Sequence, residues 1–159
     1  MITRAAEQAD LAPLARLWWS GWRDAHLAIL PEALERLRTL ESFEARMQAA
    51  LPEVRVLGPV GAPLGFHLLK DDELYQFYLA AEARGTGAAA VLMADAEARL
   101  AQAGVAVAWL ACAIGNARAA RFYEKAGWTM ARVENVPTET SEGLFPLEVW
   151  RYEKRLVNL

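Results

Sequence analysis

The segment ARGTGAAAVL, residues 83–92, combines residue types and spacing that suggest ligand chemistry. Gly85 and Gly87 stand directly before a stretch with helical periodicity, although glycine is an unfavourable residue in a helix. Glycines let the backbone turn tightly, so that successive N–H groups point into one concavity at a helix N-terminus, where the helix dipole favours an anion. The segment therefore predicts either a phosphate-binding turn or, as the alternative, a simple strand-to-helix turn.

Two common phosphate-binding motifs do not fit this segment. A nucleoside-triphosphate loop needs two glycines five positions apart followed by Lys and Ser or Thr, and no lysine stands in residues 83–92. A dinucleotide-binding fold needs three glycines after its first strand, whereas this segment lies in the middle of the chain and has two. An anion site of a different kind and a simple strand-to-helix turn therefore both stay open.

The cysteine and the histidines limit nucleophilic and metal chemistry. Cys112 is the only cysteine, which excludes a disulfide within the chain and a multi-cysteine metal site. His26 and His67 are the only histidines, and neither lies beside Cys112 in a nucleophile–base motif. We interpret Cys112 as a small buried apolar residue and expect no metal site.

Composition limits the classes of protein and partner. With 159 residues, 55% of them hydrophobic, the chain is expected to form one domain spanning residues 1–159. A net charge of −3 lacks the basic footprint of nucleic-acid binding, so no nucleic-acid partner is expected. The sequence shows no signal peptide and no apolar run that could span a membrane, and we therefore expect a cytoplasmic protein with no membrane partner.

The first half of the chain predicts helices followed by a pair of strands. Residues 11–26 have apolar positions at helical spacing, and Gly21 suggests a break in that helix. Residues 31–51 predict a second helix or a pair of helices, with Pro31 in the first turn. Residues 54–58 and 64–70 predict two antiparallel strands joined by a turn rich in glycine and proline.

The second half predicts a strand, a helix and a parallel strand, and then a closing pair of strands. The strand at residues 73–80 leads through the glycine segment into a helix at residues 88–103. The apolar strand at residues 105–113 completes a right-handed parallel crossover. A further helix begins at Asn116 and ends at Gly127, and two strands, residues 128–134 and 147–156, enclose a polar loop at residues 135–146.

Two segments resemble the GNAT superfamily of N-acetyltransferases. YQFYLAAEARGTGAAAVL, residues 75–92, is similar to its acetyl-CoA-binding signature, with Arg84, Gly87 and Ala89 at the signature positions. NARAARFYEKAGW, residues 116–128, is similar to its second hallmark, an Asn followed seven residues later by a Tyr in a helix that ends at Gly. Ala81 stands where the family commonly has proline, and Ala89 occupies a position where it has glycine or alanine.

The resemblance implies an α/β fold and a cofactor site. The expected fold is a central mixed, mostly antiparallel sheet of about six to seven strands flanked by about four helices. The implied ligand is acetyl-CoA, an acyl donor, with no metal. Its pyrophosphate is expected at the backbone of Arg84, Gly85, Thr86, Gly87, Ala88 and Ala89, and its pantetheine chain along the strand Phe77, Tyr78 and Leu79. Asn116 binds the pantetheine, caps its helix, or does both.

The resemblance also implies residues for proton transfer, since the acceptor amine must lose a proton and the departing thiolate must gain one. Tyr123, at the family's tyrosine position, is the candidate general acid, and a core tyrosine is the alternative. Glu73 is the candidate general base, and an exposed carboxylate at the start of a strand is the alternative. Trp22 and His26, in a segment similar to the family's acceptor-side helix, form an acceptor wall or pack in the core.

The resulting hypothesis is an N-acetyltransferase that moves an acetyl group from acetyl-CoA to a primary amine of a small molecule or peptide, by direct attack in a ternary complex. The alternative is a non-catalytic acyl-CoA-binding sensor or structural module of the same fold. Tyr123 favours the enzyme, because a binding module does not need a phenol beside the sulfur. The sequence also leaves room for a homodimer.

Overall fold

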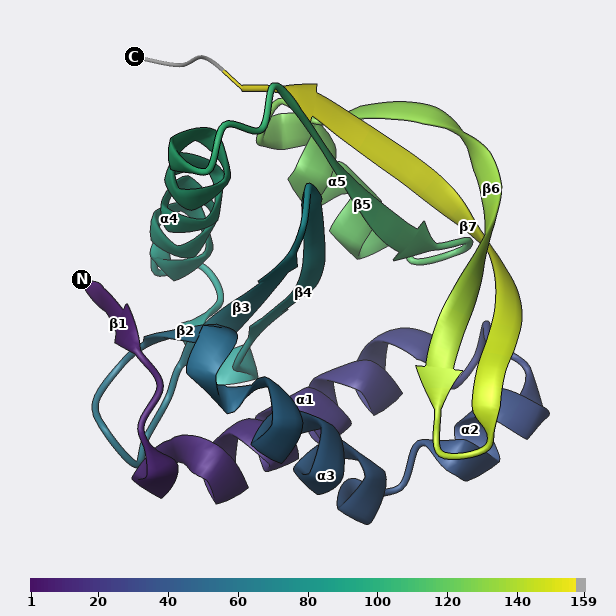
Figure 1. Cartoon of the computed structure of the whole chain (residues 1–159), viewed down its shortest axis with the longest axis horizontal. Helices are drawn as coiled ribbons and strands as arrows, with labels where there is room; N and C mark the ends of the chain where they lie inside the picture. The colour runs from purple at the N-terminus through teal and green to yellow at the C-terminus, as the bar shows by residue number, and fades with distance from the viewer. Residues whose placement is uncertain (157–159) are drawn as a thin grey trace.

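One sheet of seven strands, in the order β1-β2-β3-β4-β5-β7-β6, organises the protein (Figure 1). The computed structural model describes residues 1–156. All neighbouring strands are antiparallel except β4 and β5, which confirms the predicted mixed, mostly antiparallel sheet. The strands are β1 (Thr3–Ala5), β2 (Val54–Leu57), β3 (Gly65–Lys70), β4 (Glu73–Leu79), β5 (Val107–Ala113), β6 (Thr129–Thr140) and β7 (Gly143–Arg155).

Helices cover both faces of the sheet. Alternate residues of a strand point to opposite faces, so neighbouring residues of one strand contact helices on different sides. Phe66 of β3 packs in one core cluster with Trp18 and Phe43, while its neighbour His67 binds Asp95 of a helix on the other face, with 2.8 Å between Nε2 and Oδ2. The α-helices in the described residues are α1 (Leu11–His26), α2 (Glu32–Leu37), α3 (Leu40–Ala50), α4 (Ala88–Gln102) and α5 (Ala117–Lys125). Within residues 1–156, no helix has both the length and the apolar character that crossing a bilayer requires.

The β4–β5 junction is the predicted parallel crossover, and it opens into a wedge (Figure 1). The two strands are paired at Glu73 and Trp109, and the rest of their described length is not paired with each other. On the other edge of β4, the Ala80 amide donates to the Leu64 carbonyl at 2.7 Å. Since hydrogen-bonding direction alternates along an antiparallel strand, the N–H and C=O groups of Phe77 and Leu79 face the wedge.

The predicted break at Gly21 is wrong, because α1 runs without interruption from Leu11 to His26. A Cβ at Gly21 would lie 2.7 Å from Cδ1 of Tyr78 on β4. Gly21 therefore allows α1 to pack closely against the sheet and does not end the helix. The predicted helix pair is correct and consists of α2 and α3, with Thr39 capping α3 by accepting from the Ser42 amide at 3.1 Å.

The predicted polar loop at residues 135–146 is also wrong, because these residues extend β6 and β7 into a long hairpin. Pairing continues from Thr129↔Glu153 to Thr140↔Gly143. Half-buried residues alternate with exposed ones along the extension, for example Val136 and Thr138 between exposed neighbours. Prediction failed here because a strand pair with one face in solvent carries many polar residues and lacks a continuous apolar run.

Candidate active site

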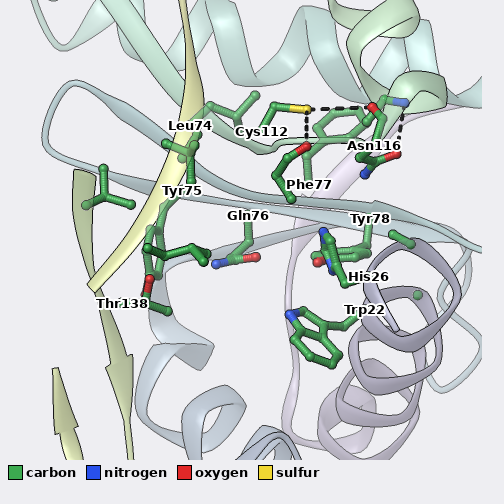
Figure 2. Close-up of a pocket in the computed structure, with 18 of the residues that line it drawn as sticks. Trp22, His26, Leu74, Tyr75, Gln76, Phe77, Tyr78, Cys112, Asn116 and Thr138 are labelled. Carbon is green, nitrogen blue, oxygen red and sulfur yellow. Dashed lines mark hydrogen bonds between the residues drawn. The ribbon is translucent and has the colours of Figure 1, made fainter. Parts of the chain in front are cut away.

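A cavity of about 740 Å³ begins in the wedge between β4 and β5 and continues to α1, α2 and the β6–β7 hairpin. In Figure 2, Cys112 and Asn116 lie on one side, Trp22 and His26 on the other, and Gln76 points into the space between them. We call the two parts the wedge half and the aromatic half. The wedge half is lined by Phe77, Leu79, Arg84, Gly85, Ala89, Cys112, Asn116 and Tyr123, and the aromatic half by Trp18, Trp22, His26, Arg38, Arg46, Tyr75, Tyr78, Thr138 and Glu139.

The glycine turn stands at the outer end of the wedge half. Gly85 and Gly87 have φ values of 75° and 86°, and Gly87 is the N-cap of α4. A Cβ on either glycine would meet no atom within 4 Å, so the left-handed backbone requires glycine while the space around it is open. The turn therefore leaves room for an anionic group beside a helix N-terminus.

The structure brings only part of the predicted phosphate-binding segment to the cavity. Arg84, Gly85 and Ala89 line it, whereas Thr86, Gly87 and Ala88 do not. The Thr86 hydroxyl accepts a hydrogen bond from the Ala88 amide at 3.3 Å, which stabilises the turn from within. Thr86 therefore has a local structural contact in addition to its place in the predicted segment.

Two arginines at the mouth of the wedge half share one carboxylate. Asp24 at the end of α1 accepts from Nη2 of Arg84 at 3.2 Å and from Nη2 of Arg118 at 3.0 Å. These hydrogen bonds lower the pKa of Asp24, with Arg118 contributing most. All three side chains are exposed, so a phosphate group could replace the carboxylate at little cost.

Asn116 has the capping contact that the sequence suggested. Its side-chain oxygen accepts from the Ala119 amide at 3.3 Å at the start of α5. The same residue lines the wedge half, and its side-chain NH₂ group, which makes no hydrogen bond within residues 1–156, is available to donate to a ligand. The two interpretations of Asn116 are therefore compatible.

Tyr123 lies on α5 with its ring between Phe122 and Tyr152, at centroid distances of 5.6 and 6.0 Å. Its hydroxyl makes no hydrogen bond to any of residues 1–156. Burial raises the pKa of Tyr123 above its usual value, so the phenol stays protonated at neutral pH. The arrangement leaves an uncommitted proton donor in the wall of the wedge half.

Cys112 lies in the same wall but is not built as a nucleophile. The residue is 3% exposed, and its Sγ lies 3.8 Å from the Ala113 carbonyl oxygen and 3.9 Å from that of Asn116. Burial raises the pKa of its thiol to about 12. Because the thiolate is the reactive species, this environment disfavours covalent acyl transfer through Cys112.

Glu73 lies at the first position of β4, at the closed end of the wedge, and its side chain lines the cavity. Burial raises the pKa of this carboxyl group to about 7, while Lys70 acts in the opposite direction. A carboxylate with a pKa near neutrality can accept a proton efficiently at physiological pH. Glu73 is therefore half-buried and not the exposed carboxylate of the alternative interpretation.

Trp22 and His26 line the aromatic half one helical turn apart, with ring centroids 5.3 Å apart. Trp22 is 6% exposed and also packs against Phe43, so it belongs both to the cavity wall and to the core. Burial lowers the pKa of His26 to about 4, which makes the imidazole neutral at physiological pH. Tyr78, predicted to lie on the pantetheine strand, has its ring stacked on Phe66 and lines the aromatic half instead.

Sequence reasoning missed several lining residues. Gln76 points into the middle of the cavity, and Arg38 lies between α2 and α3. Residues 135–139 reach the cavity because the hairpin folds over it. Alternation of Val136, Thr138 and Thr140 could have indicated the strand, but no local pattern marks Arg38 or Gln76 as cavity residues.

Several solved structures named as N-acetyltransferases share this fold. A GCN5-related N-acetyltransferase from Rhodopseudomonas palustris matches with a TM-score of 0.74 at 18% identity, covering 98% of this chain and 95% of the other. The ribosomal-protein-alanine N-acetyltransferase from Brucella melitensis matches with a TM-score of 0.72 at 22% identity, covering 98% and 100%. PaiA N-acetyltransferase from Thermoplasma acidophilum, solved in complex with coenzyme A, matches with a TM-score of 0.66 at 19% identity, covering 97% and 98%.

Sequence comparison identifies the family. Residues 13–128, more than half of the chain, match the model of the acetyltransferase (GNAT) family. The protein therefore belongs to the GNAT acetyltransferase family. A search of curated protein sequences gives no match. No cluster of three or more His, Cys, Asp or Glu residues suited to a metal ion occurs in residues 1–156.

Proposed function

We propose that this protein transfers an acetyl group from acetyl-CoA to a primary amine of a small molecule or peptide, by direct attack within a ternary complex. The observation that carries the proposal is one continuous cavity that joins an anion-accepting turn to a separate aromatic half. Tyr123 and Glu73, a protonated phenol and a carboxyl group with a pKa near 7, both line this cavity. The two halves can hold a donor and an acceptor at the same time.

The wedge half suits a long, thin donor with phosphate groups. Bound acetyl-CoA would supply the acetyl group as an activated thioester. The outward-facing amide and carbonyl groups of Phe77 and Leu79 can pair with the amides of an extended chain. Arg84 and the backbone around Gly85 can bind the pyrophosphate, and Asn116 can donate to the pantetheine.

Tyr123 and Glu73 would divide the proton transfers. Because burial disfavours the phenolate, Tyr123 holds a proton on its hydroxyl at neutral pH. This hydroxyl lines the wedge half and can donate its proton to the departing thiolate. Glu73 can accept a proton from the acceptor ammonium, directly or through water, once its carboxyl group is ionised. A purely binding module would need neither an unpaired phenol nor a half-buried carboxyl group with a pKa near 7, and these two residues therefore support the enzyme over that alternative.

The proposal is tested by donor binding together with acetyl transfer. Acetyl-CoA should raise the melting temperature, because a ligand that binds only the native state stabilises it, whereas ATP and NAD should not. Incubation with a panel of primary amines should release free CoA and yield the N-acetylated amine by mass spectrometry. Equal thermal shifts with ATP would contradict the donor assignment, and a shift with acetyl-CoA but no transfer to any amine would favour the binding module.

A further inference from the structure

The aromatic half contains a buried guanidinium that has no carboxylate partner. Arg38 follows α2 at its C-cap and is 4% exposed. Its Nε is buried without a hydrogen-bond partner, and no carboxylate of residues 1–156 lies within salt-bridge distance of it. Burial lowers the pKa of Arg38 only to about 10, so its side chain remains charged at neutral pH. A buried charge of this kind requires compensation.

Another deeply buried charge, that of Asp10, is completely compensated. Asp10 is 0% exposed and accepts from Nη1 and Nη2 of Arg4 at 2.7 and 3.0 Å. The backbone amides of Glu7 and Gly61 donate to the same carboxylate at 2.8 and 2.9 Å. Asp10 therefore forms a structural ion pair with Arg4. Arg38, in contrast, lines a cavity, and its guanidinium donates no hydrogen bond to residues 1–156.

Further donors of the aromatic half surround the same space. The guanidinium of Arg46 lies 4.3 Å from the centroid of the Trp18 ring and forms no ion pair with the described residues. The Trp18 Nε1 is also buried without a partner, and both residues line the cavity. Glu139, an acid of this wall, is already bound by Lys70 at 3.0 Å and by the Tyr75 hydroxyl at 3.3 Å. Arg38 Nε and Trp18 Nε1 are therefore buried without an acceptor, and neither Arg38 nor Arg46 pairs with a carboxylate of residues 1–156.

We propose that the acceptor is a small amine that also carries a carboxylate, and that Arg38 binds this carboxylate, with Arg46 and the Trp18 indole supporting it. This inference rests on the proposed acetyl transfer. A guanidinium matches a carboxylate with two parallel hydrogen bonds. Because Arg38 and Tyr123 line one continuous cavity, the acceptor's amine can extend from Arg38 toward the wedge half.

Binding of a carboxylate by Arg38 would favour amino-acid-like acceptors over the N-termini of proteins. A free amino acid has a carboxylate a few bonds from its amine, whereas the terminal amine of a protein is followed by an uncharged peptide bond. The hairpin residues 135–139 and α1 line the same half of the cavity, so they limit the length of an acceptor that can reach Arg38. Arg38 is therefore a specificity-determining residue and not a proton-transfer residue.

The first test compares matched acceptors on the wild-type protein. Amino acids are assayed beside their amides and methyl esters, which keep the amine and lose the negative charge, and beside aminophosphonates of the same length. We expect kcat/KM for the best amino acid to exceed that of its amide by about ten- to a hundredfold, the usual effect of a hydrogen-bonded charge pair. Equal values for acid and amide, or preference for the phosphonate, would overturn the carboxylate assignment.

The second test uses a matched pair of arginine variants on α2 and its C-cap. Arg38→Met should raise KM for the amino acid by at least about tenfold and leave kcat/KM for the amide unchanged. Arg36→Met should change neither, because Arg36 is exposed and its Nη2 lies 3.7 Å from Glu32 Oε2. Added guanidinium should restore part of the lost activity in Arg38→Ala with the acid only. A similar loss for both acceptors would assign Arg38 a structural role and overturn the proposal.

The third test measures binding without turnover and checks the folded state. Carboxylic acids that lack an amine should quench the fluorescence of Trp18 and Trp22 in the wild type and should fail to do so in Arg38→Met. The acetyl-CoA thermal shift in each variant shows whether the wedge half is intact. If this shift and acetyl transfer persist while acids neither bind nor react preferentially, the acceptor inference fails alone. If the wild type shows neither the acetyl-CoA thermal shift nor acetyl transfer, the proposed function fails.

Discussion

The wedge half and the aromatic half of the cavity offer a ligand different kinds of chemical group. The wedge half offers the backbone groups of Phe77, Leu79 and the turn at Gly85, together with side chains that lie next to this strand and turn, such as Arg84. The aromatic half offers side chains from segments far apart in the sequence, among them Trp22 of α1, Arg38 after α2 and Glu139 of the hairpin. Backbone recognition suits a donor that stays constant, whereas side-chain recognition allows the acceptor to change without altering the fold.

This contrast leads to a kinetic expectation. A variant in the wedge half should change the rate with every acceptor by the same factor, because the donor and the leaving group are common to all reactions. A variant in the aromatic half should change the rate by a factor that depends on the acceptor. The following experiments test this separation.

Tyr123→Phe should have the largest effect. Removing the hydroxyl should lower kcat by about 10² to 10⁴ with all acceptors, because every reaction releases the same thiolate. The melting temperature should change little, since the hydroxyl makes no hydrogen bond to residues 1–156. Steady-state kinetics with three or more acceptors measures both the size and the uniformity of the loss.

The matched control is Tyr152→Phe. The Tyr152 hydroxyl donates to Oε2 of Glu124 at 2.7 Å, and the residue does not line the cavity. This variant should lose about 1 kcal/mol of stability and keep its rate. If Tyr123→Phe keeps full activity while chemistry limits the rate, Tyr123 has no role in proton transfer.

Protonation of Glu73 at low pH should cause the next largest loss of kcat/KM. A base must be ionised to accept a proton, so kcat/KM should rise with pH and level off above the Glu73 pKa of about 7. At pH 5 the rate should be about a hundredfold below the plateau, because the ionised fraction falls tenfold per pH unit. Glu73→Gln should lower the plateau and remove this limb.

A second acceptor distinguishes titration of Glu73 from titration of the acceptor's amine. With acceptors whose amines have different pKa values, the limb caused by Glu73 should stay at the same pH. A limb that moves with the acceptor amine, and persists in Glu73→Gln, would assign the base elsewhere.

Gly87→Val should raise the Kd of CoA by more than about tenfold, because valine strains a residue with φ near 86° and adds bulk at the N-terminus of α4. Gly104→Val is the matched control at the other end of the same helix. Gly104 has φ near 87°, and its Cβ would also meet no atom within 4 Å. Equal CoA binding by the two variants in calorimetry would place the pyrophosphate away from this turn.

Asp24→Asn should have the smallest effect and the opposite sign. The carboxylate that competes with phosphate for Arg84 and Arg118 is removed, so CoA should bind about two- to fivefold more tightly, as expected for exposed ion pairs. The gain should disappear at high salt. Glu32→Gln removes the same charge far from the wedge and should not change CoA affinity.

The same contrast explains which parts could be predicted from the sequence. The turn at Gly85 and Gly87 and the helix that begins after Asn116 depend on contacts between residues close in sequence, and both were recognisable. Arg38 could not be identified, because its significance arises when α1, α2 and the hairpin meet. The hairpin extension was missed because its strands have one face in solvent and carry many polar residues there, as the pair Asn135↔Glu148 shows.

The wedge has a consequence for hydrogen exchange. Phe77 and Leu79 belong to a central strand, yet their amides lack a strand partner, so they should exchange with solvent like those of a sheet edge. The amides of Gln76 and Tyr78, which pair with Leu68 and Phe66, should exchange slowly. Occupation of the wedge by an extended ligand would protect the first pair and leave the second unchanged. The exchange rates of alternate amides along β4 would then show whether a donor is bound.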